Sequence, residues 1–152
     1  MNIESLSKEE YGDDYNSAVL EQWKTCVEMA NSNAEKRISS NNVFITLNSA
    51  LLAVISFSLD YKSILISVVG IVLCILWKKS IDNYRRLGKM KYLIIDEMEK
   101  KLPFTPFLCE WKELKNNPKY STLTKTEIYM PRIFIALFSL AILLPIVIRI
   151  IQ

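Results

Sequence analysis

The sequence contains no histidine, and its three cysteines, Cys26, Cys74 and Cys109, stand far apart. Without imidazole groups or closely spaced thiols there is no zinc-ligand spacing and no Cys-His pair for nucleophilic chemistry. A disulfide framework is also not expected, because three cysteines cannot all pair and Cys74 falls in an apolar stretch. We therefore expect no metal, no cofactor and no enzymatic activity, with a reducing cytoplasm around the polar segments.

Charge is nearly absent from three long stretches, residues 43–59, 63–77 and 131–151, in a chain that is 51% hydrophobic. A helix that spans a membrane needs about 20 apolar residues. A single helix from Val43 to Trp77 would be about 52 Å long at 1.5 Å per residue, which is too long for a bilayer. The sequence therefore predicts a tight hairpin of two spans over residues 43–77, bent near Asp60 and Lys62, and a third span over residues 131–152.

The flanks of these spans suggest how each one ends. Trp77 is expected in the aromatic belt at the lipid headgroups, followed by Lys78 at the aqueous edge. Pro131 is expected near the start of the third span, just after a capping box that Thr124 opens and Glu127 closes.

Basic residues set the predicted orientation. Residues 78–130 contain 12 Lys and Arg, whereas the loop between the first two spans contains only Lys62. Basic loops stay in the cytoplasm. The N-terminal stretch is acidic and lacks the basic and apolar regions of a cleaved signal peptide. We expect a multi-pass protein of the bacterial inner membrane with a cytoplasmic N-terminus and the C-terminus outside.

The polar segments have helical periodicity. No Gly or Pro occurs from Asp14 to Val69, and apolar residues recur at helical spacing before the first span and after the second. Residues 1–42 are predicted to form a cytoplasmic amphipathic helix, and residues 78–130 a basic helical segment that is also cytoplasmic. The predicted fold class is an all-α membrane protein with three transmembrane helices and two cytoplasmic amphipathic helices.

The first span carries a stripe of polar residues on one helical face. Together with Ala53, its members recur every three or four positions: Asn42, Thr46, Ser49 and Ser56. The second span has a similar stripe: Ser63, Ser67 and Gly70. Small and hydroxylated residues let transmembrane helices pack closely, so the two stripes are expected to face each other. Alternatively, one stripe lines a water path in an oligomer, which would explain why Asn48 lies outside the predicted packing face.

Two further groups are candidates for contacts outside the membrane. The first is basic: Arg85, Arg86, Lys89 and Lys91. Such residues are attracted to the anionic inner leaflet by about 1 kcal/mol each. They could instead bind a soluble cytoplasmic partner or a nucleotide signal, although the chain has no Gly-rich phosphate loop. The second group, Glu110 and Trp111, is expected to cap the cytoplasmic helices. No nucleic-acid partner is expected.

Several of these residues together resemble a family of small bacterial integral membrane proteins with three spans. The resemblance extends over about residues 20 to 140, and Gly88 stands where that family's pattern has Asn. It is carried by the following motifs: Arg37-x3-Asn41-x2-Phe44-x3-Asn48, Trp77, Ser80-Ile81-x2-Tyr84-Arg85-x-Leu87-x3-Lys91, Glu97-x-Glu99, Leu102-Pro103 and Glu110-Trp111.

The architecture, a cytoplasmic helix that leads into a membrane hairpin, is also similar to SLATT-like and other two-span effectors of bacterial anti-phage systems. This resemblance implies a non-enzymatic protein that oligomerises and perturbs or permeabilises the inner membrane. The alternative is a membrane anchor or scaffold whose cytoplasmic helices recruit a soluble partner. Either reading is compatible with a homo-oligomer.

Overall fold

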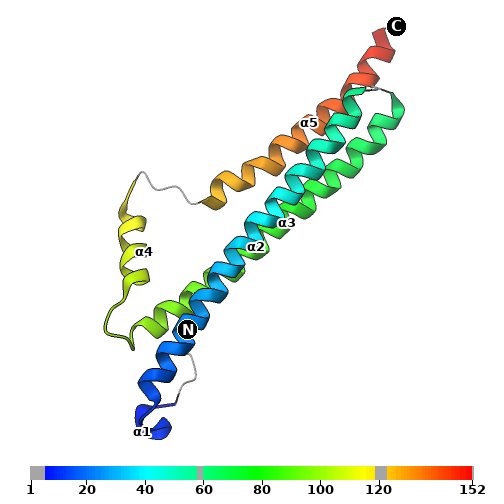
Figure 1. The fold of residues 1–152 in the computed structure, drawn as a ribbon. Helices are drawn as coiled ribbons and strands as arrows, with labels where there is room; N and C mark the ends of the chain where they lie inside the picture. The colour runs from blue at the N-terminus through cyan, green and yellow to red at the C-terminus, as the bar shows by residue number, and fades with distance from the viewer. Residues whose placement is uncertain (1–5, 58–59, 119–122, 152) are drawn as a thin grey trace. The chain divides into compact units, whose positions relative to one another are not determined.

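Two long helices account for more than half of the chain. The computed structural model describes residues 6–57, 60–118 and 123–151, and within them every regular element is helical. Figure 1 shows the helices in chain order. They are α1 (Lys8–Tyr11), α2 (Tyr15–Phe57), α3 (Tyr61–Glu99), α4 (Pro106–Asn116) and α5 (Leu123–Ile151).

The length of α2 and α3 follows from their composition. No Gly or Pro interrupts α2, which continues for 43 residues, and the 39 residues of α3 include only two glycines, Gly70 and Gly88. The predicted borders at residues 42 and 77 thus fall inside continuous helices. Three helices, α2, α3 and α5, are long and apolar enough to cross a membrane. The predicted fold class, all-α with three transmembrane helices, is confirmed.

The ends of the helices show how the hairpin and the third span begin. Asp60 caps α3, because its Oδ1 accepts hydrogen bonds from the backbone N–H of Lys62 at 2.9 Å and of Ser63 at 3.3 Å. The expectation that Pro131 lies near the start of the third helix is wrong. α5 begins at Leu123, so Pro131 lies two turns inside it, and the helix also continues through Pro145.

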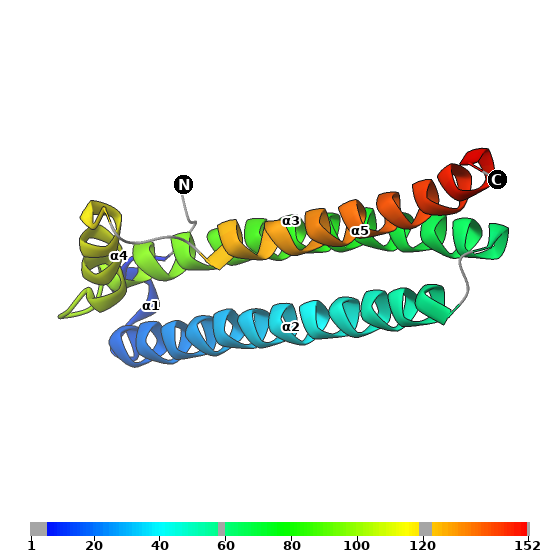
Figure 2. The same ribbon diagram turned by 90° about the horizontal axis from the view of Figure 1, so that it is seen from above.

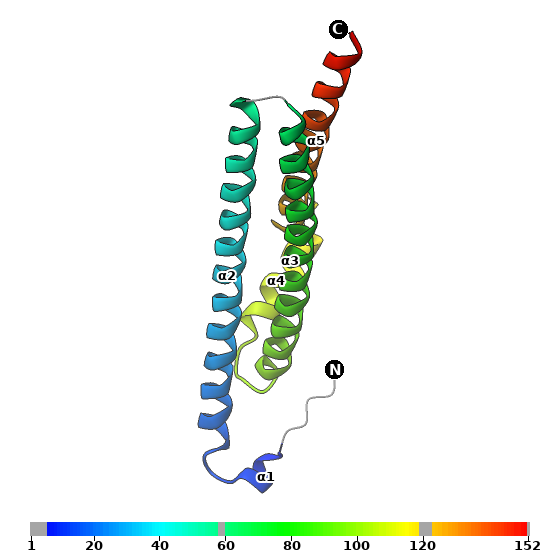
Figure 3. The same cartoon turned by 90° about the vertical axis from the view of Figure 1, so that its right-hand side faces the viewer.

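The chain divides into two units. We call Lys36–Asn83 with Thr122–Gln152 the spanning unit, and Met1–Glu35 with Tyr84–Ser121 the polar unit. In the spanning unit, α2, α3 and α5 lie side by side (Figures 2 and 3). Its apolar core is formed by four buried residues and their neighbours: Ile55, Cys74, Phe138 and Ala141.

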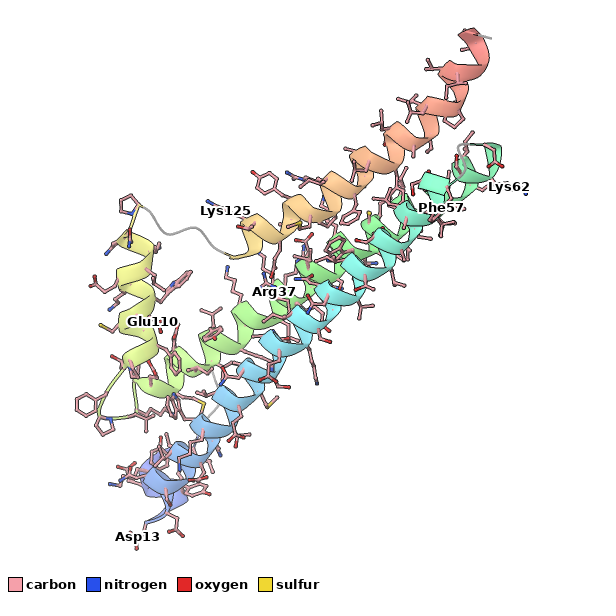
Figure 4. All side chains as sticks on the ribbon, turned by 45° about the horizontal axis from the view of Figure 1, so that its top comes forward. Asp13, Arg37, Phe57, Lys62, Glu110 and Lys125 are labelled. Carbon is pink, nitrogen blue, oxygen red and sulfur yellow. The ribbon has the colours of Figure 1, made fainter. Side chains whose placement is uncertain are left out.

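Contacts along the spanning unit give the direction of α5. Glu127, near its start, pairs with Arg37 of α2, whereas Ala141 joins the cluster around Ile55. α5 therefore runs parallel to α2. Figure 4 shows Phe57 and Lys62 at the hairpin end of this unit, away from Arg37.

The polar unit contains α1, the first part of α2, the last part of α3, and α4. A capping box starts α1, with the Ser7 backbone donating to Glu10 Oε2 at 2.8 Å, and this hydrogen bond lowers the pKa of Glu10. Gly12 ends α1 with φ at +93°, a conformation that favours glycine. The buried residues of this unit come from both long helices, such as Ala30 from α2 and Ile95 from α3.

Candidate functional site

Asn48 lies in the seam between α2 and α3. Its side chain is completely buried; Nδ2 donates to the carbonyl of Phe44 at 2.7 Å, and Oδ1 accepts from the Cys74 thiol at 3.2 Å. The expectation that Asn48 lies outside the packing face is therefore wrong. The amide can be buried because both of its ends are hydrogen-bonded, one of them across the two helices.

Trp77 is buried as well, with only 1% of its surface exposed. Its indole Nε1 donates to Asn41 Oδ1 at 2.9 Å, its ring stacks on Phe44 with centroids 5.8 Å apart, and Phe134 of α5 packs at 6.0 Å. The prediction of an aromatic-belt residue at the lipid headgroups is wrong. Trp77 shares the inward face of α3 with Cys74, one turn earlier, so it joins all three helices of the spanning unit.

The small residues of the second span lie inside the unit. Ser63 and Ser67 are buried, and the Ser67 hydroxyl donates to the Ser63 carbonyl at 2.8 Å. Gly70 lies directly against Phe138, whose ring tip would be 2.3 Å from a Cβ at this position. Gly70 thus makes room for the third span, a contact that the sequence-based interpretation did not include.

The polar stripe of the first span faces away from the other helices of the spanning unit. Four members are exposed: Asn42, Thr46, Ser49 and Ser56. The Ser56 hydroxyl donates to the carbonyl of Ala53 at 2.7 Å. The expectation that this stripe packs against the second span is wrong. Helical spacing showed that the stripe exists but not which neighbour it meets, and α2 instead contacts α3 through Asn41, Phe44 and Asn48.

The outward faces of α3 and α5 are different in character. Within residues 63–77 of α3, the exposed side chains are all apolar: Leu65, Val68, Val69, Val72, Ile75 and Leu76. Within residues 133–148 of α5 they are again apolar, as at Ile133, Leu137 and Leu140. Over these described stretches, exposed polar side chains therefore gather on α2 alone. The spanning unit thus has two apolar outward faces, on α3 and α5, and one mixed face on α2, where the polar stripe lies among exposed apolar side chains such as Val43, Leu47 and Val54.

Charged and polar contacts join the helices at the end of the spanning unit away from the hairpin. Arg37 Nε donates to Glu127 Oε2 at 2.8 Å, and Nη2 donates to the same oxygen. The side chains of the two residues are only 19% and 16% exposed. Ser40 and Ser80 share a hydrogen bond of 3.3 Å between their hydroxyl oxygens. Sequence reasoning assigned Glu127 to a capping box, and nothing in the spacing identified its partner 90 residues away.

The predicted basic residues lie on the part of α3 that belongs to the polar unit. Arg85, Arg86 and Lys89 are exposed and Lys91 is half-buried. Gly88 lies on the side of α3 that faces α2, where a Cβ would be 3.3 Å from Asn33 Nδ2. Asn33 also donates to the carbonyl of Tyr84 at 3.4 Å. The glycine thus permits a close approach of α2 and α3 and forms no phosphate loop.

The start of α4 is held by the carboxylate of Glu99, for which the sequence predicted no role. Glu99 is fully buried, and its two oxygens accept from the backbone N–H of Phe107 at 3.3 Å and of Leu108 at 3.2 Å. These N–H groups belong to the first turn of α4, so Glu99 replaces the cap that Thr105 does not form. Burial and then the charge of Glu99 raise the pKa of Asp96.

The contact of α4 with the two long helices differs from the predicted one. The ring of Phe107 packs against Trp23 of α2 at 6.0 Å and Tyr92 of α3 at 6.3 Å. Glu110 and Trp111, which were predicted to form the cap, are both exposed, and Figure 4 shows Glu110 on α4. The predicted cap is thus formed by Phe107 and Glu99.

A comparison with known families finds one match over most of the chain. A family model described as the octameric membrane protein family (8xMP) matches residues 20–147. No curated protein and no solved structure matches the chain. The matched range contains the α2 stripe, the buried seam and the ion pair between α2 and α5.

Proposed function

Because this chain belongs to the octameric membrane protein family, we propose that eight copies form a ring in the bacterial inner membrane and act there as a non-enzymatic effector that permeabilises it. The oligomer follows from the family. The proposal concerns what the oligomer does and which helix makes it possible.

The exposed polar stripe of α2 carries the proposal. Thr46 and Ser49 have exposed hydroxyls that donate no hydrogen bond within the described residues, and Asn42 has an exposed amide. An unpaired hydroxyl or amide in hydrocarbon costs roughly 2–7 kcal/mol. Within residues 63–77 of α3 and 133–148 of α5, no polar side chain is exposed, so these outward faces suit lipid. The α2 stripe suits a position between an adjoining copy and the water inside the ring, both of which supply partners.

The size of the ring makes a water path feasible. Three helices from one copy are too few to enclose water. Eight helices of about 10 Å diameter, arranged side by side in a circle, enclose a space on the order of 15 Å across. A ring lined in part by α2 would thus hold water next to Thr46, Ser49 and Ser56, and ions would cross without a charged filter.

The orientation that supports this function has the polar unit in the cytoplasm. Arg85, Arg86 and Lys89 are exposed in that unit, and basic residues are retained on the inner side, next to anionic lipids. Since α5 runs parallel to α2, the C-terminus then lies outside. An upstream signal, such as a nucleotide or a soluble protein, would act on the cytoplasmic part, as in the anti-phage effectors of similar architecture.

Leakage measurements test the path. We expect the purified octamer to release a small dye from liposomes, and a variant with Thr46→Leu, Ser49→Leu and Ser56→Leu to reduce the release by about an order of magnitude. Val68→Leu with Val72→Leu on the exposed face of α3 is the matched control and should leave the release unchanged. Wild-type octamers that release no dye, and that never depolarise cells even with the upstream trigger present, would contradict the proposal.

A second candidate function is a membrane anchor that recruits a soluble partner. The exposed side chains of Arg85 and Arg86 favour it. In that case the α2 stripe only joins helices, so the stripe variants would retain partner binding, whereas Arg85→Glu with Arg86→Glu would abolish it. Purification of the membrane protein with its bound partners distinguishes the two functions.

A further inference from the structure

An acidic row lies on the outward face of α2 in the polar unit. Its members are exposed and recur every seven residues: Glu21, Glu28 and Glu35. Residues spaced by seven share one face of a helix. The opposite face of α2 is the inward one, with Ala30 only 3% exposed and Asn33 only 8% exposed. The carboxylates therefore point away from their own chain.

The outward face of α3 in the same unit is basic and partly apolar. Arg86 and Lys89 are exposed there, next to the exposed apolar side chains of Leu87 and Met90. The inward face of this helix carries Ile95, which is completely buried.

Most of the charges on these two faces form no ion pair with the described residues. Glu21 pairs with Lys24 at 2.8 Å. Within residues 6–57, 60–118 and 123–151, Glu28, Glu35, Arg86 and Lys89 form no ion pair. Two carboxylates on one face and two cations on another thus remain available to an outside partner.

The register of the two helices sets one pair of these charges, Glu28 and Lys89, at the same level. Lys101 lies over the ring of Tyr15 at 6.0 Å, and Asn33 donates to the carbonyl of Tyr84, so α2 and α3 are antiparallel. Counting five residues back along α2 from Asn33 and five forward along α3 from Tyr84 puts Glu28 level with Lys89. By the same count Glu35 is level with Asp82, and Arg86 is about one turn of α3 away from that level.

We propose that each face is occupied by a second copy of this chain: α2 of one subunit packs on α3 of the next, with Glu28 near Lys89 and Glu35 near Arg86. This inference rests on the proposed ring. A ring with cyclic symmetry needs two different, complementary surfaces on each subunit. The subunits of such a ring are related by rotation about an axis parallel to the helices, and this rotation does not move a residue along the axis. Groups at the same height within one chain are therefore at the same height in neighbouring subunits.

A charge-reversal experiment on the full chain tests this interface. Variant A carries Glu28→Lys and Glu35→Lys, so both faces are basic. Variant B carries Arg86→Glu and Lys89→Glu, so both are acidic. We expect each variant alone to lose the eight-chain mass in detergent. Co-expression should restore that mass with equal amounts of A and B, because each face of A then meets the opposite charge on B.

Controls separate this interface from the ring itself. Glu113→Lys with Lys115→Glu, on the exposed surface of α4, should keep the eight-chain mass. Circular dichroism checks the helix content of each variant. If a variant loses helix content, the mass of the wild-type protein is measured in 1 M salt instead. The electrostatic screening length then falls to about 3 Å, which weakens the ion pairs, so the ring should dissociate.

Three outcomes would count against these ideas in different ways. If A and B each retain the wild-type mass, the interface is wrong although the ring stands. If A and B dissociate but do not assemble together, the faces bind another molecule, such as a soluble protein or lipid, and the inference is again wrong. If the wild-type chain itself is not an octamer, the proposed ring fails.

Discussion

The two ends of the spanning unit are held together by different forces. Away from the hairpin, polar bonds cross between helices, as between Arg37 and Glu127 or between Trp77 and Asn41. Toward the hairpin, apolar side chains pack, with Phe138 against Gly70 and Ile55. In a membrane, apolar side chains gain little by leaving lipid, so helices associate through close packing and hydrogen bonds. Polar bonds select which helices meet, and shape decides how closely.

The largest effect is expected from breaking the polar end at its ion pair. Arg37→Ala leaves the Glu127 carboxylate mostly buried without its cation, and we expect a loss of about 3 kcal/mol in unfolding free energy. Thermal unfolding in detergent measures it. Arg37→Met with Glu127→Leu should recover much of the loss, because no charge is then left unpaired.

The exposed pair of Lys24 and Glu21 provides the control for that experiment. Its side chains are 52% and 70% exposed, so Lys24→Ala should cost less than about 1 kcal/mol. If Arg37→Ala proves no more costly than Lys24→Ala, the ion pair does not stabilise the polar end, and the contrast between the two ends would be lost.

The apolar end should respond to a single added methyl group. Gly70→Ala brings a Cβ into the ring of Phe138, and overpacking of this kind costs typically about 1–3 kcal/mol. The measured quantity is again the unfolding temperature in detergent. Gly70→Ala combined with Phe138→Leu should recover part of the loss, since the smaller side chain vacates the space.

Gly88 is the matched control for Gly70. A Cβ there would meet the flexible end of Asn33 at 3.3 Å, and alanine also favours helix by up to about 1 kcal/mol over glycine. Gly88→Ala should therefore be less destabilising than Gly70→Ala. An equal loss at both positions would mean that the contact with Phe138 is not what requires glycine at position 70.

Sequence patterns predicted the helices better than the contacts between them. The absence of charge in three stretches, and of Gly and Pro from Asp14 to Val69, identified the three long helices, because these are local properties of the chain. The direction in which a helical face points depends on neighbours that are distant in sequence. Arg37 and Glu127 are 90 residues apart, and no spacing rule connects them.

The two wrong assignments on the inward faces have the same physical cause. Trp77 and Asn48 each combine a polar group with a side chain that can be buried, so both suit either a lipid boundary or a packed interior. A hydrogen-bond partner decides between these environments, and for Trp77 that partner is Asn41, on another helix. The helical spacing of its residues identified the α2 stripe. Its outward direction became clear only from the structure, in which other residues of α2 pack against α3.

The smallest effect is expected from a single hydrogen bond at the polar end. Asn41→Leu removes the acceptor of the Trp77 indole N–H, which is buried, and should cost about 1–1.5 kcal/mol. A double-mutant cycle with Trp77→Phe isolates this bond from the stacking on Phe44, since both changes together remove the donor and the acceptor. A coupling energy near 1 kcal/mol is expected from unfolding in detergent. Strictly additive losses would show that the indole and the amide contribute independently, and that this hydrogen bond does not distinguish the polar end from the apolar one.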